Sequence, residues 1–508
     1  MHKAKIYWPL VLSLAVVKFL LPFLEQHPMY ELQRDEYLYY QQGLHFSLSY
    51  LENPPLLSWL GTISSWFGGS EASLKFWPCL FGAATVILTC MIVAHLGGKL
   101  LAQLLAALGV MGGAFVRIHF LYQPNFLDIF FWTLSLYFLI RFINSSQQKF
   151  IMWMAISLAL GWWSKYSVLF MGLAIVTGII LSQYRNVFAK KKTWIAFLLA
   201  FLIILPNLLW QYVHNWPLLH HMEELRDTQL KYINKSDFVK DQFLMLLPAL
   251  LLWIAGLVWA LSKKQWRIIG IIYFSVILLL LFGSGKSYYT LGVYPVLIAA
   301  GAVAWEQFLG KRKWIGYAMA SVMIIFNWMI MPLLLPIWKP EKLDAFYKKI
   351  GEEHTWEDLK THPLPQDFAD MLGWKELAEK SERFFNTLPD STKATSIIYC
   401  RNYGQAGSLK FYGKDPGFKN SIISDNGSFL LWIPDTLSMK NLLFIGRRMP
   451  GKDDEVFQHF EKITVIDSVT NPYSRQLGDK IIFFENIDRA GLKLATEGLK
   501  LMKAKFNR

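Results

Sequence analysis

Eleven long apolar runs are the feature that most restricts how this chain folds. Each approaches the length of about 20 residues that an α-helix needs to cross a bilayer. Lipid offers no partners for backbone polar groups, so such segments cross as helices. The runs cover residues 6–24, 74–95, 100–118, 126–141, 150–163, 166–183, 193–212, 242–261, 268–283, 289–308 and 314–337. With 54% hydrophobic residues, the chain is predicted to be a polytopic α-helical membrane protein with about eleven transmembrane helices, or more.

The formal net charge of +14 is concentrated in the connections between these runs. Every second connection is basic and has no acidic residue, whereas the loop over residues 25–73 holds six acidic residues and one basic residue. The basic residues are Lys3, Lys5, Lys99, Arg141, Lys149, Arg185, Lys190, Lys191, Lys192, Lys263, Lys264, Arg267, Lys311, Arg312 and Lys313. The positive-inside rule then predicts a cytoplasmic N-terminus and a C-terminal tail outside. The charge is explained by membrane orientation, so no nucleic-acid partner is predicted.

Two segments determine how many membrane helices the sequence predicts. The run over residues 150–183 is interpreted as two helices with Lys165 at the outer turn, because a single helix would put Lys190 to Lys192 outside. The first run is expected to be a retained helix, because no small-residue cleavage site follows it. In the outer loop, Pro54 and Pro55 precede apolar residues at helical spacing, which predicts a helix lying along the interface with Trp59 and Trp66 as anchors.

The apolar pattern ends at Trp338, and the remaining residues have the composition of a soluble domain. We therefore divide the chain into a membrane domain over residues 1–338, with the acidic loop 25–73, and an outer α/β domain over residues 339–508. A helix is expected over Trp374–Phe385. Strands are expected over Ser396–Cys400, Ser428–Ile433, Asn441–Gly446, Lys462–Val469 and Lys480–Glu485. The three cysteines do not form a disulfide pattern.

With this topology, many of the unusual polar residues fall at the outer face. A charged group at bilayer depth costs roughly 2.5–3.5 kcal/mol, so such groups gather in wet cavities or take part in reactions. An isolated Lys or His beside a membrane is more often an interface anchor. The set is Asp35, Glu36, Glu52, Arg117, His119, Asp128, Lys165, His214, His220, His221, Arg226 and Lys286. Their convergence on one side, rather than any single residue, predicts a functional site.

The order of short motifs in the first 300 residues resembles a known family. Asp35-Glu36-Tyr-Leu-Tyr-Tyr is followed by Leu51-Glu52-Asn53-Pro54-Pro55, then Leu127-Asp128, then Gly285-Lys286-Ser-Tyr288-Tyr289. This order is similar to that of the fold-C membrane glycosyltransferases, in the bacterial branch related to protein O-mannosyltransferases and the lipid A aminoarabinose transferase. In the tail, Asn402-Tyr-Gly-Gln-Ala-Gly and Ile423-Ser-Asp-Asn-Gly look like segments of members that have an outer C-terminal domain.

The resemblance implies an enzyme of the bacterial inner membrane that takes a sugar from a polyprenyl-phosphate carrier. Members of the family usually transfer the sugar with inversion of its anomeric centre. The acceptor would be a hydroxyl or phosphate of a protein, lipid A or an envelope glycan, and membrane lipids surround the site. Such a reaction needs one base for the acceptor and cations for the departing phosphate. The resemblance places the base at Asp35. Asp128 would orient the acceptor or share the role of the base, and Glu36 would tune either one or simply begin a helix.

Lys286 and Arg226 are the first candidates for the donor phosphate, with Lys165 as a third. Tyr288 and Tyr289 either donate hydrogen bonds to it or anchor the interface. The resemblance to the aminoarabinose branch also implies a divalent metal ion held by Glu52 and His221. Asn53 stands where that branch has a lysine, and the neighbouring His220 leaves the choice of ligand open. No Walker loop is found, so no nucleotide cofactor is predicted.

Two other functions are compatible with a chain of this kind. A transporter or flippase of a lipid-linked or anionic substrate would place polar residues near the bilayer midplane in broken or repeated helices. No inverted repeat is evident. A scaffold that works through its outer domain would need far fewer membrane helices than this chain has.

Overall fold

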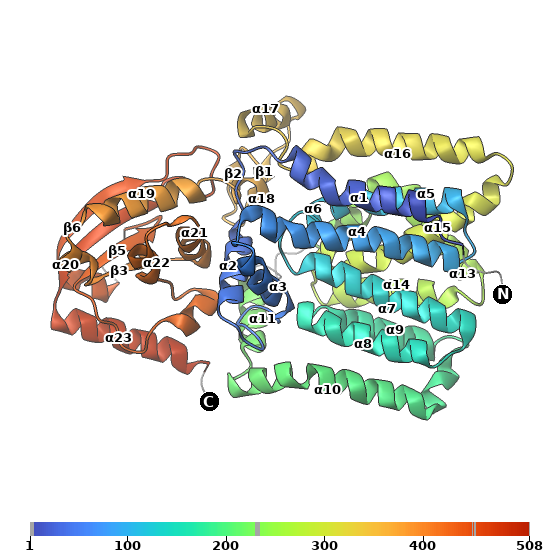
Figure 1. Ribbon diagram of the computed structural model, residues 1–508, viewed down its shortest axis with the longest axis horizontal. Helices are drawn as coiled ribbons and strands as arrows, with labels where there is room; N and C mark the ends of the chain where they lie inside the picture. The colour runs from blue at the N-terminus through green and yellow to red at the C-terminus, as the bar shows by residue number, and fades with distance from the viewer. Residues whose placement is uncertain (1–4, 229–233, 450, 452–453, 507–508) are drawn as a thin grey trace.

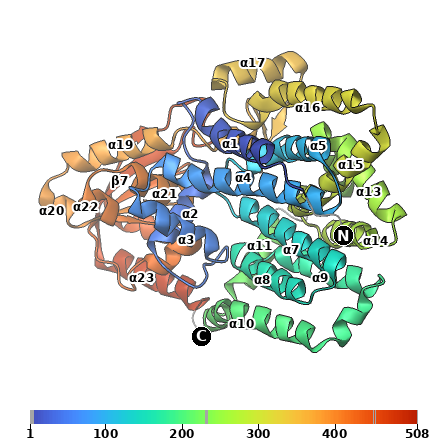
Figure 2. The same cartoon turned by 45° about the vertical axis from the view of Figure 1, so that its right-hand side comes forward.

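A computed structural model describes residues 5–228, 234–449, 451 and 454–506. Two parts make up the molecule: a bundle of apolar helices and a C-terminal domain built on a β-sheet (Figure 1). The helices α2 (Arg34–Leu44) and α3 (Leu56–Trp66) lie between the two parts in both views (Figure 2). The predicted acidic loop is therefore folded, and it occupies the junction of the two parts.

The bundle contains a helix within each of the eleven apolar runs. They are α1 (Trp8–Glu25), α4 (Glu71–His95), α5 (Leu100–Met111), α7 (Asn125–Ser145), α8 (Lys149–Ser164), α9 (Val168–Ile180), α10 (Lys191–Val213), α13 (Leu250–Ser262), α14 (Arg267–Phe282), α15 (Tyr294–Leu309) and α16 (Lys313–Leu334). Shorter helices connect them: α6 (Ala114–Ile118), α11 (Pro217–Thr228), α12 (Lys235–Leu244) and the 3-10 helix η4 (Ser287–Val293). The interpretation of residues 150–183 as two helices is confirmed, because α8 ends at Ser164 and α9 begins at Val168.

The number of crossings is smaller by length than the sequence predicts. Among the described residues, six helical segments are long and apolar enough to cross a bilayer: Trp8–Glu25, Glu71–His95, Asn125–Ser145, Lys191–Val213, Ser287–Leu309 and Lys313–Leu334. A seventh requires α12 and the segment Leu247–Ser262 to act together across a 61° bend. Helix α5 has 12 residues, or roughly 18 Å at 1.5 Å per residue, because the run over 100–118 breaks at Gly113. The predicted count of eleven is not confirmed.

The basic connections meet at one end of the bundle. The side chain of Asn144 donates to the His95 carbonyl over 2.8 Å, and Gln265 donates to Asn144 over 3.4 Å. The backbone N–H of Lys99 donates to Glu306 over 2.6 Å, which ties the connection after α4 to the end of α15. Lys3 lies outside the described residues. The basic connections of the sequence therefore lie together in the folded bundle. The orientation of the bundle in the membrane stays a prediction.

The C-terminal domain contains a mixed sheet with the strand order β4-β3-β5-β7-β6. Strands β3 (Ser396–Cys400), β4 (Ile422–Ile423) and β5 (Asn441–Gly446) are parallel, and β6 (Phe460–Ser468) and β7 (Lys480–Ile487) are antiparallel to their neighbours. The helices are α17 (Pro340–Ile350), α18 (Gln366–Ala369), α19 (Trp374–Thr387), α20 (Asp390–Lys393), α21 (Tyr403–Tyr412), α22 (Pro416–Asn420) and α23 (Arg489–Ala504), and β1 (His354–Thr355) pairs with β2 (Thr361–His362).

One predicted strand is wrong. Residues 428–432 fall in the 3-10 helix η5 (Gly427–Trp432), where Gly427 has a φ of +61°, and Ile433 follows the helix. The neighbouring Ser428 is held by Glu52 of the acidic loop rather than by a strand. The four other predicted strands are present as β3, β5, β6 and β7. A glycine with a positive φ at the start of a short apolar segment thus indicates a turn rather than a strand.

Candidate active site

Asp35 lies at the start of α2, at the junction of the bundle and the C-terminal domain. The hydroxyl of Tyr403 donates to its Oδ1 over 2.8 Å, and Arg34 Nε lies 3.3 Å from the same oxygen. Gln123 Nε2 approaches Oδ2 at 3.4 Å. The side chain of Asp35 keeps 25% of its exposure. These contacts fix the carboxylate in place while leaving it accessible to a substrate.

Glu36 is enclosed on every side, in contrast to Asp35. Both of its oxygens accept bonds from Lys75 Nζ, at 2.7 and 2.8 Å. The backbone N–H groups of Gln33 and Tyr122 add bonds of 2.6 and 2.7 Å. The residue is fully buried. These contacts give Glu36 the geometry of a structural ion pair that joins α2 to α4.

Glu52 links the acidic loop to η5 of the C-terminal domain. Ser428 donates its backbone N–H to Oε1 over 2.6 Å and its hydroxyl to Oε2 over 2.5 Å. Gln42 donates to Oε2 over 2.9 Å. Burial raises the pKa of Glu52, while the bonds from Ser428 and the nearby His221 act in the opposite direction. Both oxygens of this carboxylate are therefore already in use.

The metal site that the resemblance implies has only part of a ligand set in this chain. His221 lies close enough to Glu52 to affect the pKa of its carboxyl, so the two predicted ligands are neighbours. In the part of the chain that the structure describes, no three His, Cys, Asp or Glu side chains gather as a metal site. A hard divalent cation takes about six ligands. Among the described residues, Glu52 and His221 are therefore only part of a ligand set, and we derive no step of the reaction through a metal.

A second polar cluster surrounds Lys165 at the turn between α8 and α9. Its Nζ donates to Asn125 Oδ1 over 2.7 Å and lies 3.8 Å from the ring centre of Tyr289 and 5.4 Å from that of Tyr288. Burial lowers the pKa of Lys165 to about 8; the Asp128 carboxylate opposes this shift and Lys286 adds to it. Lys165, Lys286, Asp128 and the two tyrosines are therefore one cluster.

Asp128 is the buried carboxylate of this cluster. It lies in the first turn of α7 and is 5% exposed. The Ser167 hydroxyl donates to its Oδ2 over 2.8 Å. Its Oδ1 is buried and has no hydrogen bond of normal geometry among the described residues, and the Trp132 indole N–H lies near the carboxylate without forming one. A buried acceptor without a donor costs free energy, and a hydroxyl group of a substrate would satisfy it.

Tyr39 connects the two clusters across the junction. The residue lies on α2, and burial raises the pKa of its hydroxyl well above the usual range. Asp35, Tyr403, Glu52 and Tyr289 raise this pKa further, in that order. These groups can influence Tyr39 together only if they all lie near it. Tyr39 therefore lies near residues of the acidic loop, the C-terminal domain and η4.

Arg226 does not join this cluster through any ion pair in the structure. It is 67% exposed on α11, with Glu223 at 3.9 Å and Asp227 at 3.4 Å. The remaining outer residues have separate surroundings. Arg117 pairs with Asp367 at 3.1 Å, His119 is buried, His214 stacks on Trp210, and His220 contacts Phe506. The polar residues that the sequence places at the outer face thus include both site residues and packing residues.

Three contributors were not singled out from the sequence: Tyr403, Ser428 and Gln123. The first two belong to the C-terminal domain and reach Asp35 and Glu52. Tyr403 lies inside the tail segment Asn402-Tyr-Gly-Gln-Ala-Gly, and Ser428 directly follows Ile423-Ser-Asp-Asn-Gly. The signal that could have found them was therefore present in those tail motifs.

Known proteins share both sequence and fold with this chain. The family model described as dolichyl-phosphate-mannose-protein mannosyltransferase matches residues 52–210. The structure of ArnT from Cupriavidus metallidurans bound to undecaprenyl phosphate superposes with a TM-score of 0.60 at 11% identity, covering 94% of this chain and 98% of that one. The chain therefore has a fold similar to that of ArnT, and its residues 52–210 are similar in sequence to the mannosyltransferase family.

Two further proteins are similar to this chain. The apo structure of the same ArnT gives a TM-score of 0.61 at 11% identity, over 94% of this chain and 97% of that chain. An uncharacterized protein of Aquifex aeolicus (strain VF5) is 26% identical over 309 residues, which is 56% of this chain. The match spans 58% of that relative's length. The fold-C likeness therefore includes the C-terminal domain, whereas the family model covers α3 to α10.

Proposed function

We propose that this protein is a membrane glycosyltransferase that moves a sugar from a polyprenyl-phosphate carrier to an acceptor at the outer face of a bacterial inner membrane. The observation that carries the proposal is the pair of polar clusters near the junction. Tyr403 and Arg34 hold the accessible Asp35 carboxylate, and Lys165 lies with Tyr288 and Tyr289. The likeness to fold-C glycosyltransferases supports the proposal. The binding of undecaprenyl phosphate by ArnT supports a polyprenyl-phosphate donor.

Asp35 acts as the base in this proposal. It removes the proton from the acceptor hydroxyl, whose oxygen then attacks the anomeric carbon of the sugar. The bond from that carbon to the phosphate oxygen breaks, and the electron pair leaves with polyprenyl phosphate. Attack opposite the leaving group inverts the anomeric centre. The bonds from Tyr403 and Arg34 hold the carboxylate in the geometry that this step needs.

Lys165 and Lys286 stabilise the departing phosphate. Charge builds up on the phosphate oxygens as the bond breaks, and fixed cations in a partly dry site lower the free energy of that state. The two lysines lie together with Tyr288 and Tyr289, which line the same cluster. Asp128 accepts a hydrogen bond from a hydroxyl group of the sugar or the acceptor through its unpartnered oxygen. Glu36 holds α2 against α4 instead of taking part in the chemistry.

The experiment that tests this function uses purified protein in nanodiscs with polyprenyl phosphates that carry different labelled sugars. The account predicts release of polyprenyl phosphate and transfer of label to a hydroxyl-bearing acceptor for at least one donor. A transporter or flippase would instead move the intact lipid-linked sugar across the bilayer. Movement of intact donor without cleavage of the sugar-phosphate bond would contradict the proposal.

A further inference from the structure

A second polar pocket lies in the C-terminal domain, at the carboxyl ends of β3 and β5. From β3 the chain passes through α21 and α22 to β4 on one side, whereas β5 pairs with the other side of β3. Such a change of direction leaves a crevice at the strand ends, where open α/β sheets bind ligands. The pocket here has a volume of about 600 Å³.

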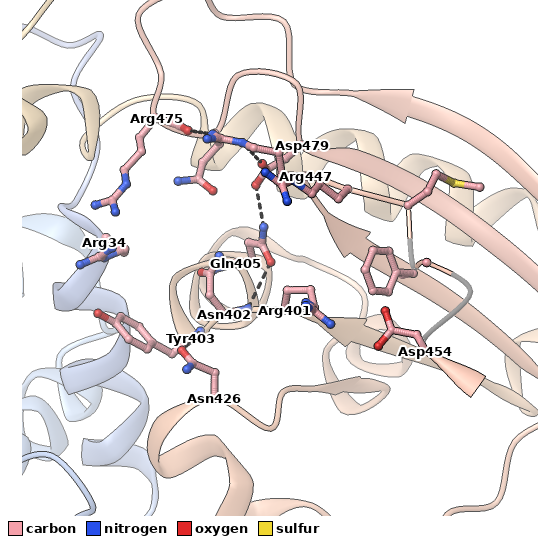
Figure 3. Close-up of a pocket in the computed structure, with 15 residues that line it drawn as sticks. Arg34, Arg401, Asn402, Tyr403, Gln405, Asn426, Arg447, Asp454, Arg475 and Asp479 are labelled. Carbon is pink, nitrogen blue, oxygen red and sulfur yellow. Dashed lines mark hydrogen bonds and ion pairs between the residues drawn. The ribbon is translucent and has the colours of Figure 1, made fainter. Parts of the chain in front are cut away.

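Arginine dominates the lining of this pocket. The charged residues that line it are Arg34, Arg401, Arg447, Arg448, Arg475, Asp454 and Asp479, which gives five positive groups against two negative ones. Figure 3 shows Arg34, Arg475, Arg447 and Arg401 arranged around the opening. We call this set of seven residues, with Tyr403 and Gln405, the arginine pocket.

The arginines differ in how far they are already neutralised. Arg475 lies 3.0 Å from Asp370 and 2.9 Å from Glu357, and Arg34 lies 3.3 Å from Asp35. By contrast, Arg401 and Arg448 are exposed and form no ion pair within the described ranges. Two guanidinium groups therefore remain to bind an anion. Guanidinium groups bind phosphate through paired hydrogen bonds, which favours a phosphate group as the ligand.

The inner side of the pocket is held rigidly. Gln405 donates to the buried Asp479 over 2.6 Å, and Arg447 Nε lies 3.3 Å from the same carboxylate. Asn402 caps α21 by accepting a bond of 2.9 Å from the Gln405 backbone. A site whose donors are already oriented loses little entropy when a ligand binds.

The arginine pocket adjoins the candidate active site. Tyr403 lines the pocket, and its hydroxyl donates to Asp35. Arg34 lines the pocket and lies beside Asp35 in the chain and in space. Tyr403 and Arg34 are therefore shared by the pocket and by the carboxylate that we propose as the base.

We propose that the arginine pocket binds a phosphate group of the acceptor and so presents the acceptor hydroxyl to Asp35. This inference rests on the proposed function for the role of the ligand, but the binding of phosphate itself does not. It assigns the C-terminal domain a part in choosing the acceptor. The acceptor class is a phosphorylated glycan or glycolipid.

Binding is tested by titrating inorganic pyrophosphate into the purified full chain in phosphatidylcholine nanodiscs. We expect saturable binding that weakens by about tenfold or more in an Arg401→Gln/Arg448→Gln variant, because charge-assisted hydrogen bonds are lost. Both side chains are exposed, so the fold should tolerate the change. Arg383→Gln, an exposed arginine of α19 outside the pocket, is the matched control. Lys286→Gln must also keep the binding, because Lys286 belongs to the membrane cluster.

Competition experiments identify the molecule that carries the phosphate. Phosphatidic acid added to the nanodiscs competes with pyrophosphate if a lipid-borne phosphate reaches the pocket, and a water-soluble sugar phosphate competes if the acceptor is a free glycan. Absence of saturable binding, or equal binding by the double variant, would overturn the proposal that the arginine pocket binds phosphate. Pyrophosphate binding without any sugar transfer would contradict the proposed function alone. Transfer by the double variant with an unchanged KM for a phosphorylated acceptor would overturn the acceptor role.

Discussion

At the scale of residues, neighbouring carboxylates of one loop have opposite surroundings. Asp35 keeps part of its exposure, whereas Glu36 is buried against Lys75 with every oxygen bonded. The sequence Asp35-Glu36 does not reveal this difference, because both residues begin the same helix. Their side chains point to different neighbours, one to the junction and one to α4. We therefore propose that Asp35 takes part in the chemistry and that Glu36 stabilises the fold.

The ion pair of Glu36 predicts a loss of stability on substitution. Glu36→Gln leaves the charged Lys75 buried without a partner, which costs about 3–5 kcal/mol. Thermal unfolding in detergent would show the loss as a lower Tm. The double variant Glu36→Gln/Lys75→Met removes both charges and should recover much of it. An unchanged Tm in the single variant would contradict the structural role.

Lys165 gives the donor site a pH dependence. Burial lowers its pKa to about 8, so the side chain is charged below that pH and loses its charge above it. Because the charged form binds the donor phosphate, KM for the donor should rise as the pH increases through about 8. Lys165→Arg keeps the charge and should shift this rise to a higher pH. An ordinary exposed lysine has a pKa of about 10.4 and stays charged over this range. A KM for the donor that does not change from pH 7 to pH 9 would therefore contradict the lowered pKa of Lys165.

At the scale of elements, η5 joins the C-terminal domain to the acidic loop, and Gly427 closely approaches Glu52. A Cβ atom at Gly427 would lie 2.1 Å from Glu52 Oε1, and the φ of +61° disfavours any side chain. Gly427→Ala should therefore break the bonds between Ser428 and Glu52 and lower both Tm and transfer activity. Gly498→Ala in α23 is the control, since no atom lies within 4 Å of its Cβ position. That change should stabilise the helix by about 0.5–1 kcal/mol. Equal behaviour of the two variants would contradict the role of η5.

At the scale of the whole molecule, the acidic loop depends on the C-terminal domain. The buried ring of Tyr37 on α2 packs against Trp374, Phe411 and Tyr412, with ring centres 5.6 to 6.0 Å apart. A chain that ends at residue 338 would expose this surface, so we expect its loop 25–73 to become protease-sensitive and its transfer activity to be lost. Protease mapping of the full and shortened chains checks this. Full activity of the shortened chain would contradict a site shared by both parts.

Much of this architecture could be predicted from the sequence, because apolar runs and charge alternation are strong local signals. The helices, the strand β3 and the gathering of charged residues at one end all followed from them. The length of α5 was harder to predict, since the helix ends at Met111, where Gly112 is extended and Gly113 has a φ of +57°. The partners of Asp35 and Glu52 could not be derived, because Tyr403 and Ser428 lie more than 350 residues away in the chain. Contacts between such distant segments depend on the packing of whole domains.

The measurement that tests the account most directly compares Asp35→Asn with Asp237→Asn, an exposed carboxylate of α12, in one assay. Binding of polyprenyl phosphate and single-turnover transfer of a labelled sugar are measured on the same nanodisc preparation. The account predicts that both variants bind the lipid as the wild type does, and that Asp35→Asn alone loses transfer by about 100- to 10,000-fold, the contribution of a general base. Transfer by Asp35→Asn at the wild-type rate would contradict it.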